Sequence, residues 1–141
     1  MGIAAALQWM GRRCKPPFVA LIGHSMGAAT VMMEAGAKNK LGLRGQDRFD
    51  AYVAMSPRGP GSIFPPDALR EIRKPVLVLT GTRDNALEGG WKSRTIAYAD
   101  MSPGCKRLGV VDSATHFNFA GIGLAAQTEE LKLGATSAFL N

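Results

Sequence analysis

The sequence predicts an α/β fold built around a parallel β-sheet. Short apolar runs alternate along the chain with segments rich in helix-forming residues, and this rhythm is typical of parallel sheets covered by helices. The runs at 18–23 and 75–80 are apolar at nearly every position, which favours strands buried on both faces. A length of 141 residues suits one domain rather than two.

The first half of the chain contains two predicted helix–strand units. In order, they are a helix over 2–14, a strand over 18–23, a helix over 28–40 and a strand over 49–55. The first helix ends before Pro16 and Pro17, because proline cannot continue a helix. The second is expected to end at the basic residues that precede Gly42.

The second half begins with a loop at 57–66 that is rich in proline and glycine. The elements after it are a short helical turn over 67–72, a strand over 75–80, a helix over 91–99, a strand over 106–111 and a helix over 129–140. Asp67 is the expected cap of the short turn. The last helix offers Leu131, Leu133 and Phe139 to the core.

The strand at 18–23 lacks an evident second neighbour. It is apolar on both faces, the residues before it are predicted to be helical, and an exposed apolar edge promotes aggregation. We therefore expect either further strands before Met1, which would make 1–141 a partial domain, or a second chain that covers this edge.

Composition argues against several classes of function. The net charge of +6 comes from scattered basic residues without interleaved aromatic residues, whereas a nucleic-acid surface would cluster them. The longest apolar runs are far shorter than a membrane span.

Cys14 and Cys105 form no CxxC pair and are expected to be free thiols. No metal-ligand cluster, GxGxxG or phosphate-cradling loop is present, so we expect no metal and no cofactor. The start, 1–10, lacks the basic end of a signal peptide, which leaves the cytoplasm as the default compartment.

A short motif marks the first site of chemistry. The run Gly23-His24-Ser25-Met26-Gly27 joins a predicted buried strand to a predicted helix, which is the context of a G-x-S-x-G nucleophile elbow. Such a turn is tight, and its two glycines leave room for neighbouring backbone. It projects the serine oxygen from the carboxyl edge of the sheet. Ser25 is therefore the candidate nucleophile.

A serine hydroxyl needs a base to become a nucleophile. The chain has two histidines. His24 is adjacent to Ser25, and its side chain is expected to point away into packing or a local hydrogen bond. His116 follows the last predicted strand and is the candidate base.

The imidazole in turn needs a carboxylate that fixes its tautomer. Asp84 follows the strand at 75–80 and leaves the same edge of the sheet, so we favour it. Asp112 is the main rival, because it lies four residues before His116, and Glu88 is a weaker one.

From Phe18 to about Phe119 the chain resembles the carboxyl-terminal half of α/β-hydrolases, especially their dienelactone hydrolase-like and polyester hydrolase/lipase-like branches. The matching stretches are GHSMG at Gly23, SP at Ser56, PVLVLTGTRD at Pro75 and ATHFNF at Ala114. The resemblance implies an α/β-hydrolase fold that lacks its amino-terminal strands. The order Ser25, Asp84, His116 is the order of that superfamily.

The resemblance also implies an oxyanion hole. One donor is the backbone N–H of Met26, directly after the nucleophile. The second donor normally comes from a loop after an early strand, and the chain has no counterpart of it. Loss of one such donor costs about 2.7–4 kcal/mol of transition-state stabilisation.

Together these residues predict a serine hydrolase that cleaves a small carboxylic ester through an acyl-enzyme, with thioesters and enol-lactones left open. The loop at 57–66, including Ile63 and Phe64, is expected to line the substrate pocket. Trp91, Phe117 and Phe119 are further candidates for substrate contact. The alternative is a hydrolase-like interaction module without catalysis, which the lack of amino-terminal strands motivates.

Overall fold

The computed structural model describes residues 2–87, 89–122 and 126–141, without the side chains of 126–129, 131 and 132. Helices and strands alternate along the chain, so the predicted α/β class is confirmed. The elements are α1 (Ile3–Arg13), β1 (Ala20–His24), α2 (Met26–Glu34), β2 (Ala51–Met55), η1 (Ala68–Glu71), β3 (Val76–Arg83), α3 (Lys92–Ala99), β4 (Lys106–Thr115), η2 (Asn118–Ala120) and α4 (Ala126–Leu140).

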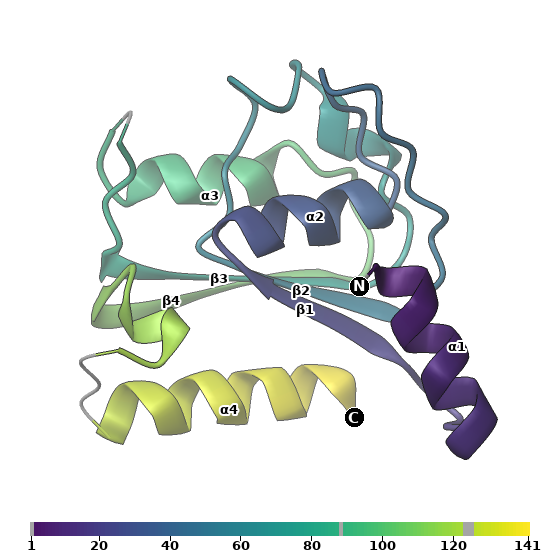
Figure 1. The fold of residues 1–141 in the computed structure, drawn as a ribbon. Helices are drawn as coiled ribbons and strands as arrows, with labels where there is room; N and C mark the ends of the chain where they lie inside the picture. Colours follow the sequence, from purple (N-terminus) through teal and green to yellow (C-terminus); the bar gives the residue numbers. More distant parts are fainter. Residues whose placement is uncertain (1, 88, 123–125) are drawn as a thin grey trace.

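The four strands form one parallel sheet in the order β1-β2-β3-β4. Helices α2 and α3 lie over one face and α4 lies under the other (Figure 1), which is the layering that a parallel sheet needs. Because all strands point the same way, the segments after their carboxyl ends start at one edge. Ser25, Ser56, Asp84 and His116 each follow a strand end there.

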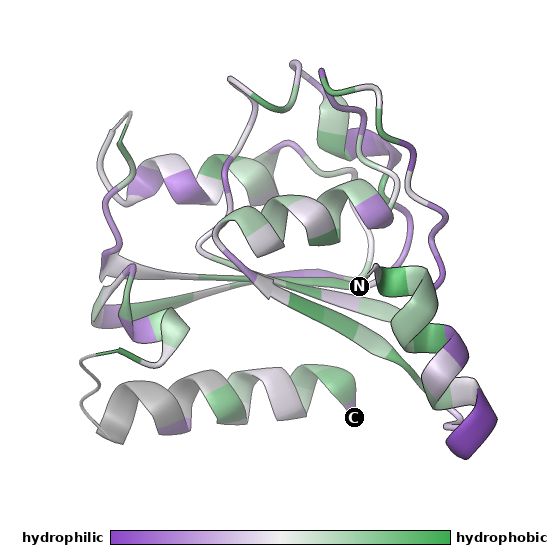
Figure 2. Cartoon of the chain, in the orientation of Figure 1, coloured by the Kyte–Doolittle hydropathy of each residue, from purple (hydrophilic) through white to green (hydrophobic). Residues whose placement is uncertain are grey.

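The buried side chains divide into two apolar clusters, one on each face of the sheet. Along β2, Tyr52 and Ala54 belong to the cluster that includes α2, whereas Val53 and Met55 belong to the cluster that packs against α4. This is the two-residue period of a strand. Figure 2 shows hydrophobic colour running along the strand layer between the helices. Removal of this apolar surface from water is the main stabilising term of the fold.

Among its described side chains, helix α4 contributes to the core near its carboxyl end. Phe139 packs against the cluster that contains Val53 and Met55, as does Ala135 one turn before it. Leu133 is 59% exposed, so the expectation that it joins the core is wrong. Two residues before Ala135, it falls on the opposite side of the helix. The side chain of Leu131 lies outside the described residues.

Strand β1 is more exposed than its sequence predicts. Ile22 is 48% exposed and Phe18, just before the strand, is 46% exposed. Among the described residues β1 pairs with β2 alone, so one edge and part of each face of β1 remain open. The expectation of burial on both faces is correct for the run in β3, where Val76 to Gly81 are buried, and wrong for β1.

Helix α2 ends at Glu34, six residues before the predicted end. Gly36 adopts a φ of 106°, which glycine tolerates at no steric cost. Its N–H donates to the Met33 carbonyl, and the Ala37 N–H donates to the Met32 carbonyl. This pair of bonds is a Schellman cap, and Gly36, not Gly42, stops the helix.

Strands β3 and β4 extend beyond their predicted ends, to Arg83 and Thr115. Gly81 permits this, because a Cβ atom there would stand 2.2 Å from the Ala114 carbonyl oxygen. The close approach ends in the Arg83–Thr115 pairing after an irregularity in the register. The two strand ends that precede Asp84 and His116 are therefore held directly against each other.

The short turn η1 is capped differently from the prediction. Asp67 makes no side-chain cap. The carboxylate of Asp100, at the end of α3, instead accepts hydrogen bonds from the N–H groups of Asp67 and Leu69, at 3.2 and 3.0 Å. The cap comes from a residue 31 or more positions away, which no local pattern reveals.

Candidate active site

Ser25 occupies the turn between β1 and α2 in a strained conformation. Its φ is 57° and its ψ is −112°, a region that non-glycine residues rarely adopt. A Cβ atom at Gly23 would lie 2.3 Å from the Gly27 carbonyl oxygen, whereas one at Gly27 would meet nothing within 4 Å. Gly23 therefore permits the tight turn, and the expectation that both glycines relieve a close approach is correct for Gly23 alone.

The turn brings the hydroxyl of Ser25 to the imidazole of His116. Ser25 Oγ and His116 Nε2 are 3.1 Å apart, and His116 Nδ1 and Asp84 Oδ1 are 2.9 Å apart. The side chain of Asp84 is fully buried, while that of His116 is 26% exposed. The structure thus places the three predicted side chains in one continuous chain of contacts from hydroxyl to imidazole to carboxylate.

Asp84 has partners on both carboxylate oxygens. Thr80 Oγ1 donates to Oδ2 at 2.9 Å, and Oδ1 contacts His116. A second contact of Oδ1 is Arg94 Nε, at 3.3 Å. A buried carboxylate needs such partners because its desolvation is costly.

The rival carboxylates do not take this position. Asp112 accepts hydrogen bonds from Thr82 Oγ1 and Ser113 Oγ, at 2.9 and 3.3 Å, so it shapes the loop after β4 instead. Glu88 lies outside the described residues.

Two residues of the site escaped the sequence analysis, Arg94 and Thr80. Arg94 lies on the inward side of α3, where it shares a stripe with the buried Ala97 and Met101. The spacings of three and seven residues are a helical signal, and a charged residue on such a stripe is the sign that could have revealed it. Thr80 ends the apolar part of β3 and offered no comparable signal.

His24 was expected to point away from the site, but its ring lies against His116, with 4.6 Å between centroids. Its Nε2 is buried and has no hydrogen-bond partner among the described residues. Burial lowers the pKa of His24, and the neighbouring His116 lowers it further. A neutral His24 therefore forms one wall beside the imidazole.

Met26 is the first residue of α2, and the N–H groups of a first helical turn have no partner within the helix. These groups form the positive end of the helix dipole. The N–H of Met26, next to Ser25, is thus available to an anionic oxygen. The Met26 side chain is 58% exposed.

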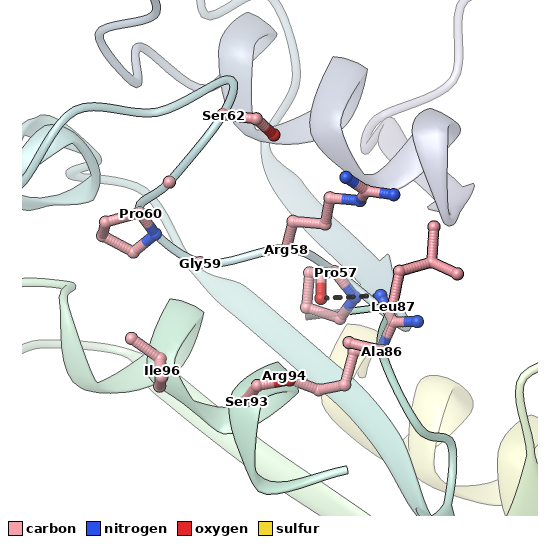
Figure 3. A pocket seen from close by; sticks show the side chains of 11 residues that line it. Pro57, Arg58, Gly59, Pro60, Ser62, Ala86, Leu87, Ser93, Arg94 and Ile96 are labelled. Atoms are coloured by element: carbon pink, nitrogen blue, oxygen red, sulfur yellow. Dashed lines mark hydrogen bonds between the residues drawn. The ribbon is translucent and has the colours of Figure 1, made fainter. Parts of the chain in front are cut away.

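A cavity of about 130 Å³ lies beside the site. The loop from Pro57 to Ser62 forms one side and Ser93, Arg94 and Ile96 of α3 form the other (Figure 3). Neither Ser25 nor His116 lines it. Arg94 is the residue that joins the cavity to the His116–Asp84 pair.

The aromatic residues expected to contact a substrate differ in position. Phe64 and Phe119 are 0% and 4% exposed and belong to the core clusters, so they pack rather than face a ligand. Ile63 packs against the core as well, and Trp91 precedes α3 and does not line the cavity. Phe117 is 62% exposed, and its ring stands edge-on to His116 at 5.9 Å.

Other expectations concern the rest of the molecule. Cys14 and Cys105 are both exposed and free. Within the described residues, no group of three His, Cys, Asp or Glu side chains could hold a metal ion. In the same part of the chain, no helix has the length and apolar character needed to cross a bilayer.

Comparison with known proteins gives similarity at the level of structure. No protein-family model matches the chain, and no curated protein matches it. The esterase domain of a Rhodothermus marinus protein has a TM-score of 0.57 at 20% identity, over 81% of this chain and 57% of that one. TT1662 from Thermus thermophilus has a TM-score of 0.54 at 19% identity, over 96% of this chain and 59% of that one. This chain thus spans less than two thirds of either structure. The parallel sheet, the turn at Ser25 and these two likenesses identify the architecture as the α/β-hydrolase fold.

Proposed function

We propose that the chain is a serine hydrolase that cleaves small carboxylic esters, with Ser25 as nucleophile, His116 as base and Asp84 as the carboxylate that orients the imidazole. The observation that carries this proposal is the chain of contacts at 3.1 and 2.9 Å from Ser25 Oγ through His116 to Asp84 Oδ1. It connects three segments distant in sequence at the carboxyl edge of the sheet. One structural neighbour is an esterase domain, which agrees with the proposal.

The chemistry follows from the geometry. His116 Nε2 accepts the proton of Ser25 Oγ as that oxygen attacks the ester carbonyl. The Met26 N–H and the dipole of α2 stabilise the negative oxygen that forms. His116 then returns the proton to the departing alcohol, leaving an acyl-enzyme. Water, activated by His116, hydrolyses the acyl-enzyme and restores Ser25.

Two features are proposed to contact the substrate. The exposed ring of Phe117 stands beside the imidazole, where it can cover the apolar part of an ester. The cavity between the 57–62 loop and α3 can hold the end of the substrate that lies farther from the reacting carbonyl. Ile96→Trp narrows this cavity and should shift the preference toward shorter esters, measured as the ratio of kcat/KM for short and long acyl chains.

The direct test is labelling by a fluorophosphonate probe together with turnover of a chromogenic short-chain ester. Wild-type chain should be labelled and active, and Ser25→Ala should lose both. His116→Asn should lower kcat by about 10⁴-fold or more, because the base is removed. Equal labelling of Ser25→Ala and wild type would refute the assignment of the nucleophile.

Ser56 offers a matched control. Like Ser25 it directly follows a parallel strand and has a positive φ, 51° against 57°. It is fully buried, however, and its Oγ has no hydrogen-bond partner in the described part of the chain. Ser56→Ala should keep both labelling and turnover. A folded wild-type chain that neither labels nor turns over ester would instead favour a hydrolase-like module without catalysis.

A further inference from the structure

The proposed reaction makes no use of the most buried arginine near the site. Arg94 comes from α3, and its side chain is 7% exposed, although arginine is almost never fully buried unless it is paired. It approaches both members of the acid–base pair, with Nε 3.3 Å from Asp84 Oδ1 and Nη2 3.2 Å from His116 Nδ1.

The remaining contacts of Arg94 are with the backbone of two loops. Nη1 donates to the Ser56 and Pro57 carbonyls after β2, and Nε and Nη2 donate to the Asp84 and Asn85 carbonyls after β3. The four distances are 3.2, 3.4, 3.4 and 3.4 Å. A planar guanidinium with five N–H donors suits such a ring of acceptors, and a lysine ammonium does not. Arg94 therefore fastens the wall of the cavity and the loop that carries Asp84 to one rigid fork.

The position of Nη2 has an electrostatic consequence for His116. The negative charge of Asp84 favours a protonated imidazole, whereas a guanidinium at 3.2 Å disfavours it. The positive charge of Arg94 thus offsets part of the effect of the carboxylate.

Nδ1 of His116 also faces two groups with opposite requirements. Asp84 Oδ1 accepts a hydrogen bond, so it holds a proton on Nδ1 and leaves Nε2 free to accept from Ser25. The guanidinium only donates, so Nη2 can bond to Nδ1 only in the other tautomer, in which Nε2 carries the proton. The distance of 2.9 Å to Oδ1 against 3.2 Å to Nη2 favours the tautomer that can deprotonate Ser25.

We propose that Arg94 is a positioning residue of the hydrolytic site, which sets the charge and orientation of the Asp84–His116 pair while it fixes the loops after β2 and β3. The inference rests on the proposed function of Ser25, His116 and Asp84. It assigns Arg94 no contact with the reacting atoms.

The test compares Arg94→Met and Arg94→Lys with wild type over a range of pH. Arg94→Met should lower kcat by about ten- to hundredfold, as expected for the loss of charged hydrogen bonds, with the smaller share of the effect in KM. The acid limb of its kcat/KM profile should move to higher pH, because Asp84 then acts on His116 without compensation. Arg94→Lys should restore the acid limb and only part of kcat, since it keeps the charge and loses the fork.

Arg48→Met is the control for a general effect of removing an arginine bonded to a buried carboxylate, because Arg48 bonds to Glu34 away from the site. It should leave kcat and the acid limb unchanged. Titration with the fluorophosphonate probe gives the active fraction of each variant. If the loss in Arg94→Met equals its loss of active fraction, or if its acid limb does not move, Arg94 is merely structural and the proposal is wrong.

Chemical rescue and a spectroscopic signal make the result independent of folding and of turnover. Guanidinium ion at sub-denaturing concentration should restore activity to Arg94→Ala, and sodium ion at equal ionic strength should not. The proton NMR signal of His116 Nδ1–H should titrate at higher pH in Arg94→Met than in wild type. If wild-type chain shows no turnover, the proposed function fails. The NMR titration then decides on Arg94 alone, and an unchanged midpoint overturns its role.

Discussion

Two arginines in this molecule bond to buried carboxylates, and the two pairs are built differently. Arg48 forms a two-pronged contact with Glu34 at the end of α2, with Nε–Oε1 and Nη2–Oε2 distances of 2.7 and 2.9 Å. Arg94 contacts a single carboxylate oxygen of Asp84, at 3.3 Å. That oxygen also contacts His116, and the other nitrogens of Arg94 are spread over backbone carbonyls.

The first pair has the geometry of a structural clamp. Both Glu34 carboxylate oxygens accept hydrogen bonds from one guanidinium, the arrangement with the strongest charge-assisted hydrogen bonds. These bonds hold the pKa of Glu34 below its ordinary value, against the opposing effect of burial. The backbone N–H of Arg48 adds a longer contact to Oε1, at 3.4 Å.

In the second pair, the Asp84 carboxylate keeps bonding capacity that Arg94 does not use and that is available to the His116 imidazole. A tighter Arg94–Asp84 contact would satisfy the carboxylate and weaken its hold on His116. The comparison teaches that a buried ion pair at a reactive site is kept looser than a structural one, so that a third group can share it.

The largest effect is expected for Asp84→Asn. An amide in place of the carboxylate can donate to Nδ1, which stabilises the wrong tautomer of His116. We expect kcat for ester turnover to fall by about 10⁴-fold with the fold retained. Steady-state kinetics and circular dichroism of the same sample check this. A decrease in kcat of less than about tenfold, against the 10⁴-fold expected, would mean that Asp84 does not hold the imidazole.

Glu34→Gln should show the opposite profile. Its side chain is 6% exposed, and the change removes a charged acceptor from Arg48, so the free energy of unfolding should fall by about 1–3 kcal/mol. Turnover per folded molecule should be unchanged. Because the pKa of Glu34 is lowered on folding, the pair stabilises the fold above pH 4.5, and this stabilisation is lost as pH falls through the folded value. Urea unfolding at pH 7 and pH 4 measures both effects, and the acid loss should be smaller in Glu34→Gln.

Thr80→Val tests whether the looser pair depends on its remaining donor. The change is nearly isosteric and fully buried, and it removes the 2.9 Å bond to Asp84 Oδ2. We expect kcat/KM to fall about tenfold, from about 1–1.5 kcal/mol of lost hydrogen bonding. The same change at Thr95, whose hydroxyl bonds within α3, should have no such effect on turnover. Equal kinetics of Thr80→Val and wild type would show that Arg94 and His116 suffice to hold the carboxylate.

The smallest effect concerns His24. Because burial and His116 lower its pKa from 6.5, the folded chain binds fewer protons than the unfolded chain just below pH 6.5. Stability is therefore present above pH 6.5 and decreases as pH falls through the folded value. Chemical unfolding of wild type between about pH 7.5 and 5, a range around the reference histidine pKa of about 6.5, should show this decrease in the free energy of unfolding. His24→Gln should lack the decrease. An identical step in the variant would assign it to another group.

Much of the architecture follows from local pattern in the sequence. The apolar runs fix the strands, and their alternation with helices fixes the parallel sheet, so that the ends of β1, β3 and β4 meet at one edge. This topology is why a motif at Ser25 and single residues at Asp84 and His116 could be singled out and lie together in the structure. Their catalytic role stays a prediction.

The features that sequence analysis missed depend on contacts between distant segments. Arg94 shares a helical stripe with Ala97 and Met101 in the sequence, but its partners become evident only when α3 is placed against the loops after β2 and β3. Asp100 caps η1 across the fold, and the partner of Gly81 is Ala114 on the neighbouring strand. The end of α2 is the exception, because Gly36 is a local stop signal in the sequence, six residues before the Gly42 at which the helix is predicted to stop.

The close pairing at Gly81 holds two of the three candidate site residues on directly paired strands and leaves the third on a separate strand. Asp84 and His116 follow two adjacent strands that are paired up to Arg83 and Thr115, so the strand pairing fixes their relative position. Ser25 follows β1, which is separated from β3 and β4 by β2. The N–H of Ser25 is bonded to β2 at the Met55 carbonyl, 2.9 Å away. Strand β2 is thus the spacer that sets the gap between hydroxyl and imidazole. A small change in its core side chains would alter that gap while each half of the site kept its internal shape.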